Sequence, residues 1–350
     1  MFTNDITKKI KVGNVYIGGA APISIQSMLN VRADDVAGNV AQAVELESAG
    51  CDIVRVSVPD KAAVELIYKI KEKINIPLVA DIHFDYRLAL ESVAAGVDKI
   101  RINPGNIGEQ ENIKKVAVTC KAAGVPIRIG VNSGSIEKEI LARYGAATPE
   151  AMVESGLYHV SLLNKFDFDD IVLSLKSSDT ATTYAAYVLA AEKCPYPLHL
   201  GVTEAGTYNM GVVKSSAALG GLLLRNIGNT IRVSLTDNPV REVEAAKDLL
   251  KALDLRKGGI KFVSCPTCGR TKIDLISLAK KAEEQLKNID KDITVAIMGC
   301  VVNGPGEAAA ADIGIAGGDG CAVLFKKDGT KRKIEEKDIL EELTKEIKML

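Results

Sequence analysis

The stretch DIVRVSVP, residues 52–59, decides the fold of this chain. It is rich in β-branched residues, which favour a strand, and side chains two positions apart on a strand share a face. Ile53, Arg55 and Ser57 therefore lie on one face, and the valines between them lie on the other. We expect the valine face to pack against helices and the face with Arg55 to lie inside the fold.

The same pattern occurs eight times along the chain, each time as an apolar run that ends in polar residues and a turn. The eight runs span residues 23–28, 52–59, 77–84, 99–106, 126–135, 170–179, 197–206 and 230–239. Helical stretches such as VAGNVAQAVELESAG separate them, and several end at a glycine. Eight alternating units over about 240 residues match the size of a (β/α)8 barrel. A doubly wound open sheet is the alternative, but it more often has a glycine-rich loop after its first strand, which ISIQSMLN lacks.

The order of elements predicts two domains. Residues 1–252 form the TIM barrel, with an opening hairpin at 8–19, and residues 253–259 form a linker with two glycines. Residues 260–350 form a small α+β domain with a strand at 260–264, a helix at 271–286, and strands at 293–299, 311–317 and 321–327. A final charged helix is expected from Ile334.

Composition and charge exclude several classes of protein. Lys and Arg number 44 and Asp and Glu number 45, so no overall charge favours nucleic acid or a membrane surface. No apolar run is long enough to span a bilayer, and the N-terminus lacks the apolar run of a signal peptide. Seven cysteines in such a chain indicate free or metal-bound thiols in a reducing cytoplasm.

Cations from five predicted strands point to the C-terminal mouth of the barrel, where barrel enzymes build their active sites. These cations are Arg55, Arg101, Arg128, Lys176 and Arg232. Salt bridges to Asp81 and Glu204 are one interpretation, but two acids cannot neutralise five cations. A small polyanion with phosphate oxygens is the other, since arginine binds phosphate through two N–H groups. Neutral side chains at the same strand ends can add contacts: Asn103, Asn132, Ser133, Ser178 and Ser234.

Two further chemistries remain open at this mouth. Lys176 on the sixth strand has the position of a Schiff-base lysine, which with the arginines suggests a phosphosugar lyase. Asp81 and His83 lie two apart and can share protons, although a single histidine in an apolar run is often a core residue.

The second domain carries a cysteine site. Cys265 and Cys268 have C-x-x-C spacing, which suits zinc, a redox disulfide or an iron–sulfur cluster. Cys300 precedes an Asn-Gly-Pro-Gly turn whose backbone N–H groups can approach a cluster. The fourth ligand is open: Glu307 is a candidate that a substrate can displace, but it is also a natural helix cap, and Cys321 begins what reads as a regular strand.

Ten motifs in this chain occur together in one family. They are IQSM, DIVRVSVP, VADIHFD, KIRINPGN, PIRIGVNSGS, DIVLSLKSSD, HLGVTEAG, TIRVSLT, CPTCGRT and MGCVVNGPGEA. On these motifs the chain resembles the bacterial 4-hydroxy-3-methylbut-2-enyl diphosphate synthases over nearly its whole length. Asn229 is a departure, because the family usually has Asp before TIRVSLT. No large insert separates the domains, as in the compact bacterial form.

The resemblance implies a function and a cofactor. It implies a [4Fe–4S] cluster on Cys265, Cys268, Cys300 and Glu307, and a two-electron reductive ring opening of 2-C-methyl-D-erythritol 2,4-cyclodiphosphate with loss of water. The resemblance also implies that electrons come from flavodoxin or ferredoxin and that the enzyme is a homodimer. The cations would then bind the diphosphate, and Asp81, His83 and Glu204 would handle protons or hydroxyl groups.

Overall fold

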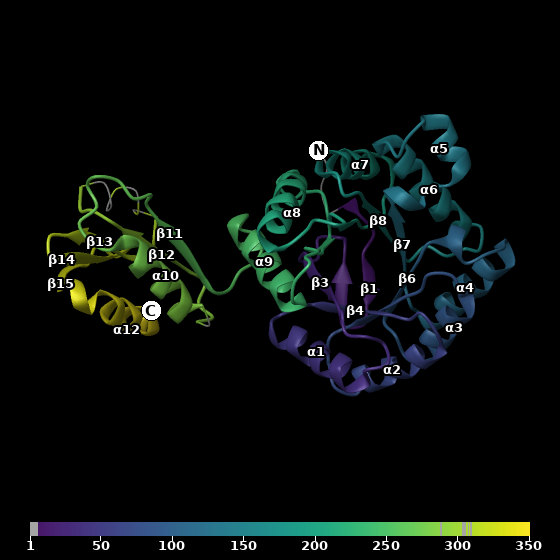
Figure 1. Cartoon of the computed structure of the whole chain (residues 1–350), viewed down its shortest axis with the longest axis horizontal. Coiled ribbons are helices and arrows are strands. Elements are labelled where there is room, and N and C mark those ends of the chain that lie inside the picture. Colours follow the sequence, from purple (N-terminus) through teal and green to yellow (C-terminus); the bar gives the residue numbers. More distant parts are fainter. Residues whose placement is uncertain (1–5, 288, 303–305, 307, 309) are drawn as a thin grey trace. The chain divides into compact units, whose positions relative to one another are not determined.

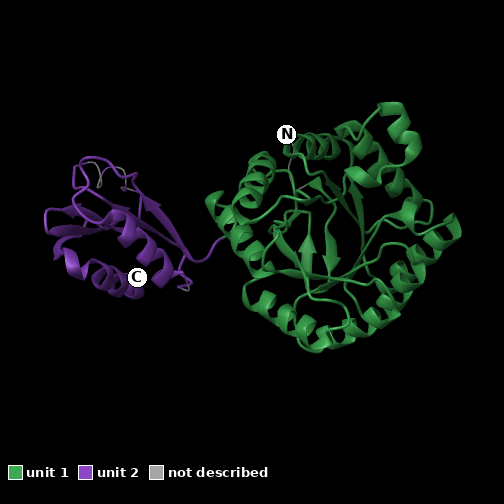
Figure 2. Ribbon diagram, viewed as in Figure 1, with its two compact units in different colours: residues 1–256 green, residues 257–350 purple. Residues whose placement is uncertain are grey.

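The computed structural model describes residues 6–287, 289–302, 306, 308 and 310–350. The chain divides into two compact units, residues 1–256 and 257–350 (Figure 2). None of the described helices is both long and apolar enough to cross a membrane.

Within the described part of the first unit, eight strands form one parallel sheet in the order β8-β7-β6-β5-β4-β3-β10-β9. A parallel bridge between Leu173 and Leu198 joins the two ends of this sheet and closes it into a barrel. The predicted (β/α)8 barrel is therefore confirmed, with a strand in each of the eight runs. The strands are β3 Ser24–Met28, β4 Ile53–Ser57, β5 Leu78–Asp81, β6 Lys99–Ile102, β7 Ile127–Asn132, β8 Ile171–Lys176, β9 His199–Leu200 and β10 Thr230–Ile231.

Helices follow the strands and surround the barrel (Figure 1). Short 3-10 helices, η2 Pro104–Asn106 and η3 Ser133–Ser135, come directly after β6 and β7. The α-helices are α1 Val36–Ser48, α2 Lys61–Lys71, α3 Tyr86–Ala94, α4 Gln110–Ala123, α5 Lys138–Tyr144, α6 Pro149–Asn164, α7 Thr180–Lys193, α8 Tyr208–Leu223 and α9 Pro239–Ala252.

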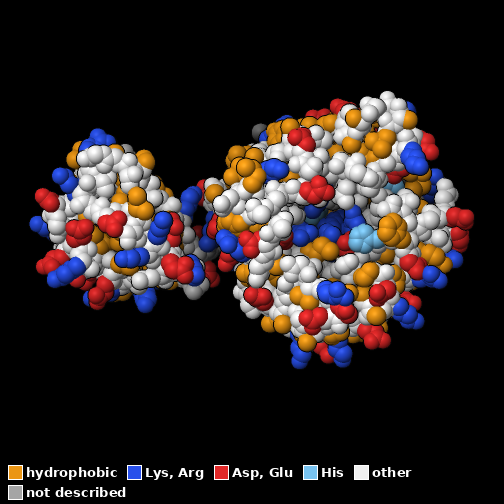
Figure 3. Space-filling model, in the orientation of Figure 1, with side chains coloured by type: hydrophobic (Ala, Val, Ile, Leu, Met, Phe, Trp, Pro, Cys, Tyr) orange, Lys and Arg blue, Asp and Glu red, His pale blue; other side chains and the backbone are white. Residues whose placement is uncertain are grey.

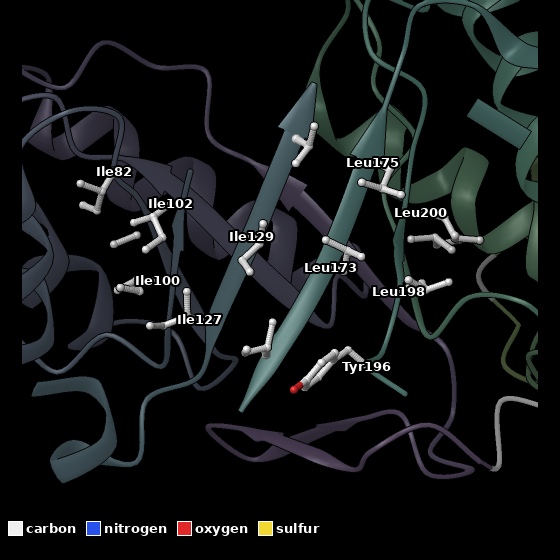
Figure 4. Packing of buried hydrophobic residues seen from close by; sticks show 14 of the residues in the cluster. Ile82, Ile100, Ile102, Ile127, Ile129, Leu173, Leu175, Tyr196, Leu198 and Leu200 are labelled. Atoms are coloured by element: carbon white, nitrogen blue, oxygen red, sulfur yellow. The ribbon is translucent and has the colours of Figure 1, made fainter. Parts of the chain in front are cut away.

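The alternation along the strands divides the core into an outer and an inner part. Val54, Val56 and Val58 belong to the large cluster between strands and helices, and Figure 4 shows residues such as Ile100 and Leu173 in the same cluster. Near the N-terminal ends of the strands, the inward residues instead pack with the opening hairpin, β1 Ile10–Val12 and β2 Val15–Ile17. This hairpin turns at Gly13, whose φ is 56°. We call this inner cluster the apolar plug: Ile10, Val12, Ile17, Ile53, Val79 and Val172. It closes the N-terminal end of the barrel.

A repeated side-chain contact ties neighbouring barrel strands together. The carboxylates of Asp52 and Asp98 accept hydrogen bonds from the backbone N–H groups of Ile25 (2.7 Å) and Leu78 (2.8 Å). Asn229 makes the same contact to Leu198 N at 3.0 Å, and its amide also donates to Thr7 Oγ1 at 3.2 Å. Asparagine therefore retains the acceptor that an aspartate supplies here.

The second unit contains one mixed sheet in the order β11-β12-β13-β14-β15. The first three of its strands are parallel and the last two run antiparallel to their neighbours. Its apolar core lies between this sheet and helices α10 and α12. The elements are β11 Ile260–Ser264, α10 Leu275–Leu286, β12 Ile293–Met298, β13 Ile313–Gly318, β14 Cys321–Lys326, β15 Lys331–Glu335, η4 Glu336–Asp338 and α12 Ile339–Met349.

The predicted helix start at Ile334 is wrong. Residues Lys331–Glu335 form the edge strand β15, which follows a turn at Gly329 and pairs with β14. Only Ile334 of this strand is buried, so the sequence lacks an alternating apolar signal, and lysines on an edge discourage further strand pairing. The helix begins at Ile339. The other helix of this unit begins at Leu275 rather than at Thr271, because Asp274 caps it by accepting from Ser277 N.

Candidate active site

The five predicted cations come together at the C-terminal end of the barrel. Figure 3 shows Lys and Arg side chains lining the hollow at the centre of the barrel unit, with a histidine beside it. Arg128 is 1% exposed and Lys176 is 7% exposed, so both are buried. Exposed lysines and arginines need no explanation, but a group of buried cations does.

Asp81 neutralises part of this group. Its carboxylate lies 2.9 Å from Arg55 Nη2, 3.3 Å from Arg101 Nη1 and 3.6 Å from His83 Nε2. Burial alone would raise the pKa of Asp81, but Arg55, Arg101, His83 and Arg128 outweigh it and hold the pKa at about 2. Asp81 is therefore a permanent carboxylate, and it ties two arginines and a half-exposed histidine into one network.

A second acid, Glu242 on α9, was not among the predicted site residues. Its two carboxylate oxygens each accept from the guanidinium of Arg232, both at 3.1 Å. Glu242 is 3% exposed and also accepts from Ser27 Oγ at 2.8 Å. Nothing in the helical pattern of residues 239–252 distinguishes it from a surface glutamate, so only the closed barrel reveals this contact.

Glu204 forms no ion pair with these cations or with any other described residue. It is exposed and lies in a loop after β9 with φ of 53°. The interpretation in which Asp81 and Glu204 neutralise the mouth is therefore wrong for Glu204, because its backbone turns it away from the strand.

Arg128 and Lys176 have no direct carboxylate contact among the described residues, although Asp81 acts on Arg128 from a longer distance. The guanidinium of Arg128 has one side-chain hydrogen bond among the described residues, to Gln26 Oε1 at 3.5 Å, and Lys176 has none. Burial, together with the neighbouring arginines, lowers the pKa of both groups well below their usual values. Such a site is stabilised by an incoming anion, because the anion replaces the missing counter-charge.

Two glycines make room for these long side chains. A Cβ on Gly130 would lie 2.4 Å from Nε of Arg101, and a Cβ on Gly201 would lie 2.7 Å from Nζ of Lys176. Arg101 also donates to the carbonyl oxygen of Gly130 at 3.1 Å. A larger residue at either position would force the cation that crosses it to move.

The predicted neutral donors lie at or just after the strand ends, and they differ in how deeply they are buried. Asn103 is buried, and its Oδ1 accepts from Gly105 N at 3.2 Å, which leaves its NH2 group as the donor. Asn132 and Ser133 lie half-buried where β7 passes into η3, and Ser234 is half-buried after β10. Ser178 is exposed beyond the end of β8 at Lys176, so strand alternation does not govern its direction.

Sequence reasoning missed two buried titratable side chains inside the barrel, Lys99 and His199. Both are 0% exposed. Burial lowers the pKa of each well below its usual value, and the cation Arg128 adds to the effect. The inward phase of Arg101 would have found Lys99, which lies two residues earlier on β6.

The cysteines of the second unit lie on two adjacent loops. Cys265 follows β11 and Cys300 comes shortly after β12, its parallel neighbour. The backbone N–H of Gly299 donates to Cys265 Sγ at 3.2 Å, which joins the two loops. Cys268 is exposed, and a hydrogen bond from the backbone of Arg270 lowers its thiol pKa.

Glu307, the fourth predicted ligand, lies outside the described residues. Among the residues that the structure describes, no three His, Cys, Asp or Glu side chains are grouped closely enough to hold a metal ion. The donor set nevertheless fits an iron–sulfur cluster in chemistry. Three thiols occupy neighbouring loops, and one thiol sulfur already accepts a backbone N–H.

Known protein families match both units of the chain. A family model described as the GcpE TIM-barrel domain matches residues 7–247, and one described as the GcpE protein C-terminal domain matches residues 261–349. A relative from Caldanaerobacter subterraneus subsp. tengcongensis is 58% identical over 99% of this chain and 97% of its own. One from Clostridium perfringens is 56% identical over 98% of this chain and 99% of its own. Both are named 4-hydroxy-3-methylbut-2-en-1-yl diphosphate synthase (flavodoxin).

Solved structures of other enzymes share the barrel alone. Dihydropteroate synthase from Stenotrophomonas maltophilia aligns with a TM-score of 0.53 and 15% identity over 71% of this chain and 97% of its own. 3-Dehydroquinate dehydratase from Geobacillus kaustophilus aligns with a TM-score of 0.52 and 14% identity, over 71% of this chain and 98% of its own. These likenesses concern the fold, whereas the family models and the close relatives extend over both units. The chain therefore belongs to the GcpE family.

Proposed function

We propose that this chain converts 2-C-methyl-D-erythritol 2,4-cyclodiphosphate into (E)-4-hydroxy-3-methylbut-2-enyl diphosphate, a precursor of isoprenoids. The reaction is a two-electron reductive ring opening with loss of water. The names of its relatives support this function. The observation that carries it is a pair of buried cations, Arg128 and Lys176, which no carboxylate contacts directly in the described part of the chain, at a mouth where a diphosphate can supply negative charge.

The diphosphate is bound by the cationic mouth. Arg128 and Lys176 contribute cations that no carboxylate contacts directly among the described residues, while Arg55, Arg101 and Arg232 are oriented by Asp81 and Glu242. An arginine whose position is set by a carboxylate loses little freedom on binding a ligand. Neutral donors complete the substrate contacts: Asn103, Asn132, Ser133, Ser178 and Ser234.

Protons and hydroxyl groups are handled by Asp81, His83 and Glu204. Asp81 is charged and buried, so its role is to orient the arginines and His83. His83 is half-exposed beside it and is the better placed to exchange protons with a ligand. Glu204 is exposed in the loop after β9, where it can reach a ligand only from the open side of the mouth.

The cofactor in this proposal is a [4Fe–4S] cluster held by Cys265, Cys268, Cys300 and Glu307. When bound, such a cluster supplies one-electron transfers and a Lewis-acidic iron. The chain's own contribution is the pair of adjoining loops, in which the backbone N–H of Gly299 donates a hydrogen bond to Cys265 Sγ.

Further parts of the proposal concern the surroundings of the reaction. Electrons come from flavodoxin, which the names of the relatives mention, or from ferredoxin. The enzyme acts as a homodimer in the cytoplasm. Its domains are residues 1–252 and 260–350, joined by a linker at 253–259. The boundary between the two compact units, after residue 256, falls within this linker.

A Schiff-base lyase that uses Lys176 is not supported by the relatives, which are named for a different reaction. Borohydride trapping distinguishes the two functions. In our proposal, borohydride leaves no substrate covalently attached to Lys176.

The decisive experiment is anaerobic purification followed by iron and sulfide analysis and a turnover assay with reduced flavodoxin. We expect about four irons per chain and formation of the open diphosphate. Zinc in place of iron, or about two irons or fewer per chain, contradicts the proposal.

A further inference from the structure

Lys99 occupies an unusual position between the cationic mouth and the apolar plug. Its neighbours Ile100 and Ile102 belong to the outer core, so Lys99 points into the barrel as Arg101 does. Its partner in the β5–β6 ladder is Val79, a member of the apolar plug. Lys99 therefore lies one layer below Arg101 and is sealed from the N-terminal end of the barrel.

Among the described residues, no acidic side chain contacts the amine of Lys99. It is 0% exposed, and its Nζ has no hydrogen-bond partner within the described part of the chain. The nearest charges are the cations Arg128 on β7 and Arg55 on β4, which add to burial in lowering its pKa. Asp81 on β5 is engaged by Arg55 and Arg101 one layer above. In the empty barrel, burial and these cations therefore disfavour the protonated form of the amine.

The proposed reaction changes the charge of the ligand in this barrel. Ring opening breaks the bond between carbon 2 and its phosphate oxygen and the bond between carbon 3 and its hydroxyl group. Two electrons from the reduced carrier and one proton enter, a double bond forms between these carbons, and water leaves. The cyclic diphosphate carries two negative charges, and the open diphosphate carries three once the released phosphate is ionised.

We propose that Lys99 takes up a proton when a diphosphate occupies the barrel mouth, and that it holds this proton most firmly while the open product is bound. Lys99 thus acts as a positioning charge below the ligand, not as a catalytic residue that touches it. This inference rests on the proposed function. It explains why an apparently unfavourable buried lysine is placed beneath an anion site: its charge is present only when the anion is.

The sign of the pH dependence follows from this linkage. The charged or titratable groups that act on Lys99 are Arg128 and Arg55, and the buried imidazole of His199 on β9 is its other neighbour, while Arg101 and Asp81 lie one layer above. An anion raises the pKa of Lys99 from its lowered value towards the ordinary one. The gain in affinity is fully present below the pKa of the empty barrel, and is lost as the pH rises through the pKa of the complex.

Calorimetry measures this proton uptake directly. The anaerobic holoenzyme, without reductant so that no turnover occurs, is titrated with the cyclic diphosphate and with the open diphosphate. Each titration is run in two buffers of different ionisation enthalpy near neutral pH. We expect proton uptake with both ligands, and more with the open one. In Lys99→Met, which preserves the length of the side chain, uptake falls by up to about one proton per chain and affinity for the open diphosphate falls about tenfold or more.

Controls separate the possible failures. Lys121→Met removes an exposed lysine of α4 and must leave proton uptake unchanged. Lys99→Gln is a second uncharged variant and must lose the same proton as Lys99→Met. The inference is overturned if the wild-type enzyme binds these ligands without proton uptake, if either Lys99 variant retains the full uptake, or if uptake disappears in His199→Gln instead. Failure of the wild-type holoenzyme to bind either diphosphate overturns the proposed function together with the inference.

Discussion

The carboxylate of Glu242 accepts two hydrogen bonds from the guanidinium of Arg232, through Nε and Nη2, each at 3.1 Å. The pair joins the start of α9 to the end of the last barrel strand. It also leaves Arg232 Nη1, near Met28 Sδ at 3.6 Å, as the part of the guanidinium without a carboxylate partner. The fold thus presents an arginine to the mouth with its orientation already set.

Glu242→Gln is expected to destabilise the ligand-free protein by about 2–4 kcal/mol, because it leaves a largely buried arginine without its counter-charge. Inorganic pyrophosphate should recover part of this loss by supplying negative charge to Arg232. Thermal unfolding with and without pyrophosphate measures both effects. The control is Asp237→Asn, which weakens a more exposed ion pair with Arg241 and should change stability by less than about 1 kcal/mol. Equal losses in the two variants would show that Glu242 has no special role.

Arg128→Met should separate ligand binding from stability. Removing a buried cation without a carboxylate partner costs the empty barrel little or stabilises it, whereas a charged hydrogen bond to the diphosphate is worth about 1.5–3 kcal/mol. We therefore expect unchanged thermal stability and iron content but a clear loss of substrate affinity. Titration calorimetry and an unfolding curve measure the two quantities. An affinity equal to that of the wild-type enzyme would exclude Arg128 from the substrate site.

The pH dependence of stability tests the network around Asp81. Its pKa is about 2 in the folded chain, against 3.8 for the ordinary carboxyl group. A lowered pKa adds stability above the ordinary pKa that is lost as the pH falls towards the folded-state value. Asp81 therefore contributes on the order of 2 kcal/mol near neutral pH, which disappears between about pH 4 and pH 2. Asp81→Asn should be less stable at pH 6, and its denaturant midpoint should approach that of the wild-type chain near pH 3. A constant difference across this range would show that the charge of Asp81 is not the cause.

Gly130→Ala tests the space that Arg101 needs. Gly130 has no left-handed backbone angle, so alanine fits the strand, but its Cβ would lie 2.4 Å from Arg101 Nε. Because Arg101 must move and weaken its contacts with Asp81 and the Gly130 carbonyl, we expect substrate affinity to fall about tenfold, the equivalent of one charged hydrogen bond. The control is Gly220→Ala on α8, where the nearest atom is 3.7 Å away. If both variants bind substrate as the wild-type enzyme does, the position of Arg101 is not important for binding.

The sequence predicted the barrel and its cations for one reason: inward and outward residues alternate along a parallel strand. The valines of 52–59 and the isoleucines beside Arg101 therefore marked the helix-facing side, and Arg55 and Arg101 marked the interior. Contacts made across the closed barrel carry no such signal. Glu242 reads as an ordinary residue of an amphipathic helix until α9 lies beside β3 and the strand end at Arg232.

Local geometry explains the remaining misses. Glu204 lies beyond the end of β9 at Leu200, and a positive φ at Glu204 means that strand alternation cannot predict the direction of its side chain. The strand Lys331–Glu335 buries a single residue, so its sequence resembles the charged start of a helix. The turn at Asp328 and Gly329 that pairs it with β14 is a hairpin signal, and sequence reasoning missed it because the strand after it shows no apolar alternation.

The last prediction concerns the fourth ligand of the proposed cluster. If Glu307 holds one iron, Glu307→Ala should retain three irons on Cys265, Cys268 and Cys300 and release the fourth, so that a [3Fe–4S] fraction grows under mild oxidation. Turnover should fall sharply, because the iron that is lost is the one open to substrate. Cys321→Ser is the matched control: this thiol begins β14, lies beside Gly318 in the turn from β13, and has no ligand role in the proposal. Paramagnetic resonance of both variants decides the question. A normal four-iron signal and normal turnover in Glu307→Ala, together with loss of the cluster in Cys321→Ser, would make Cys321 the fourth ligand and leave Glu307 as a helix cap.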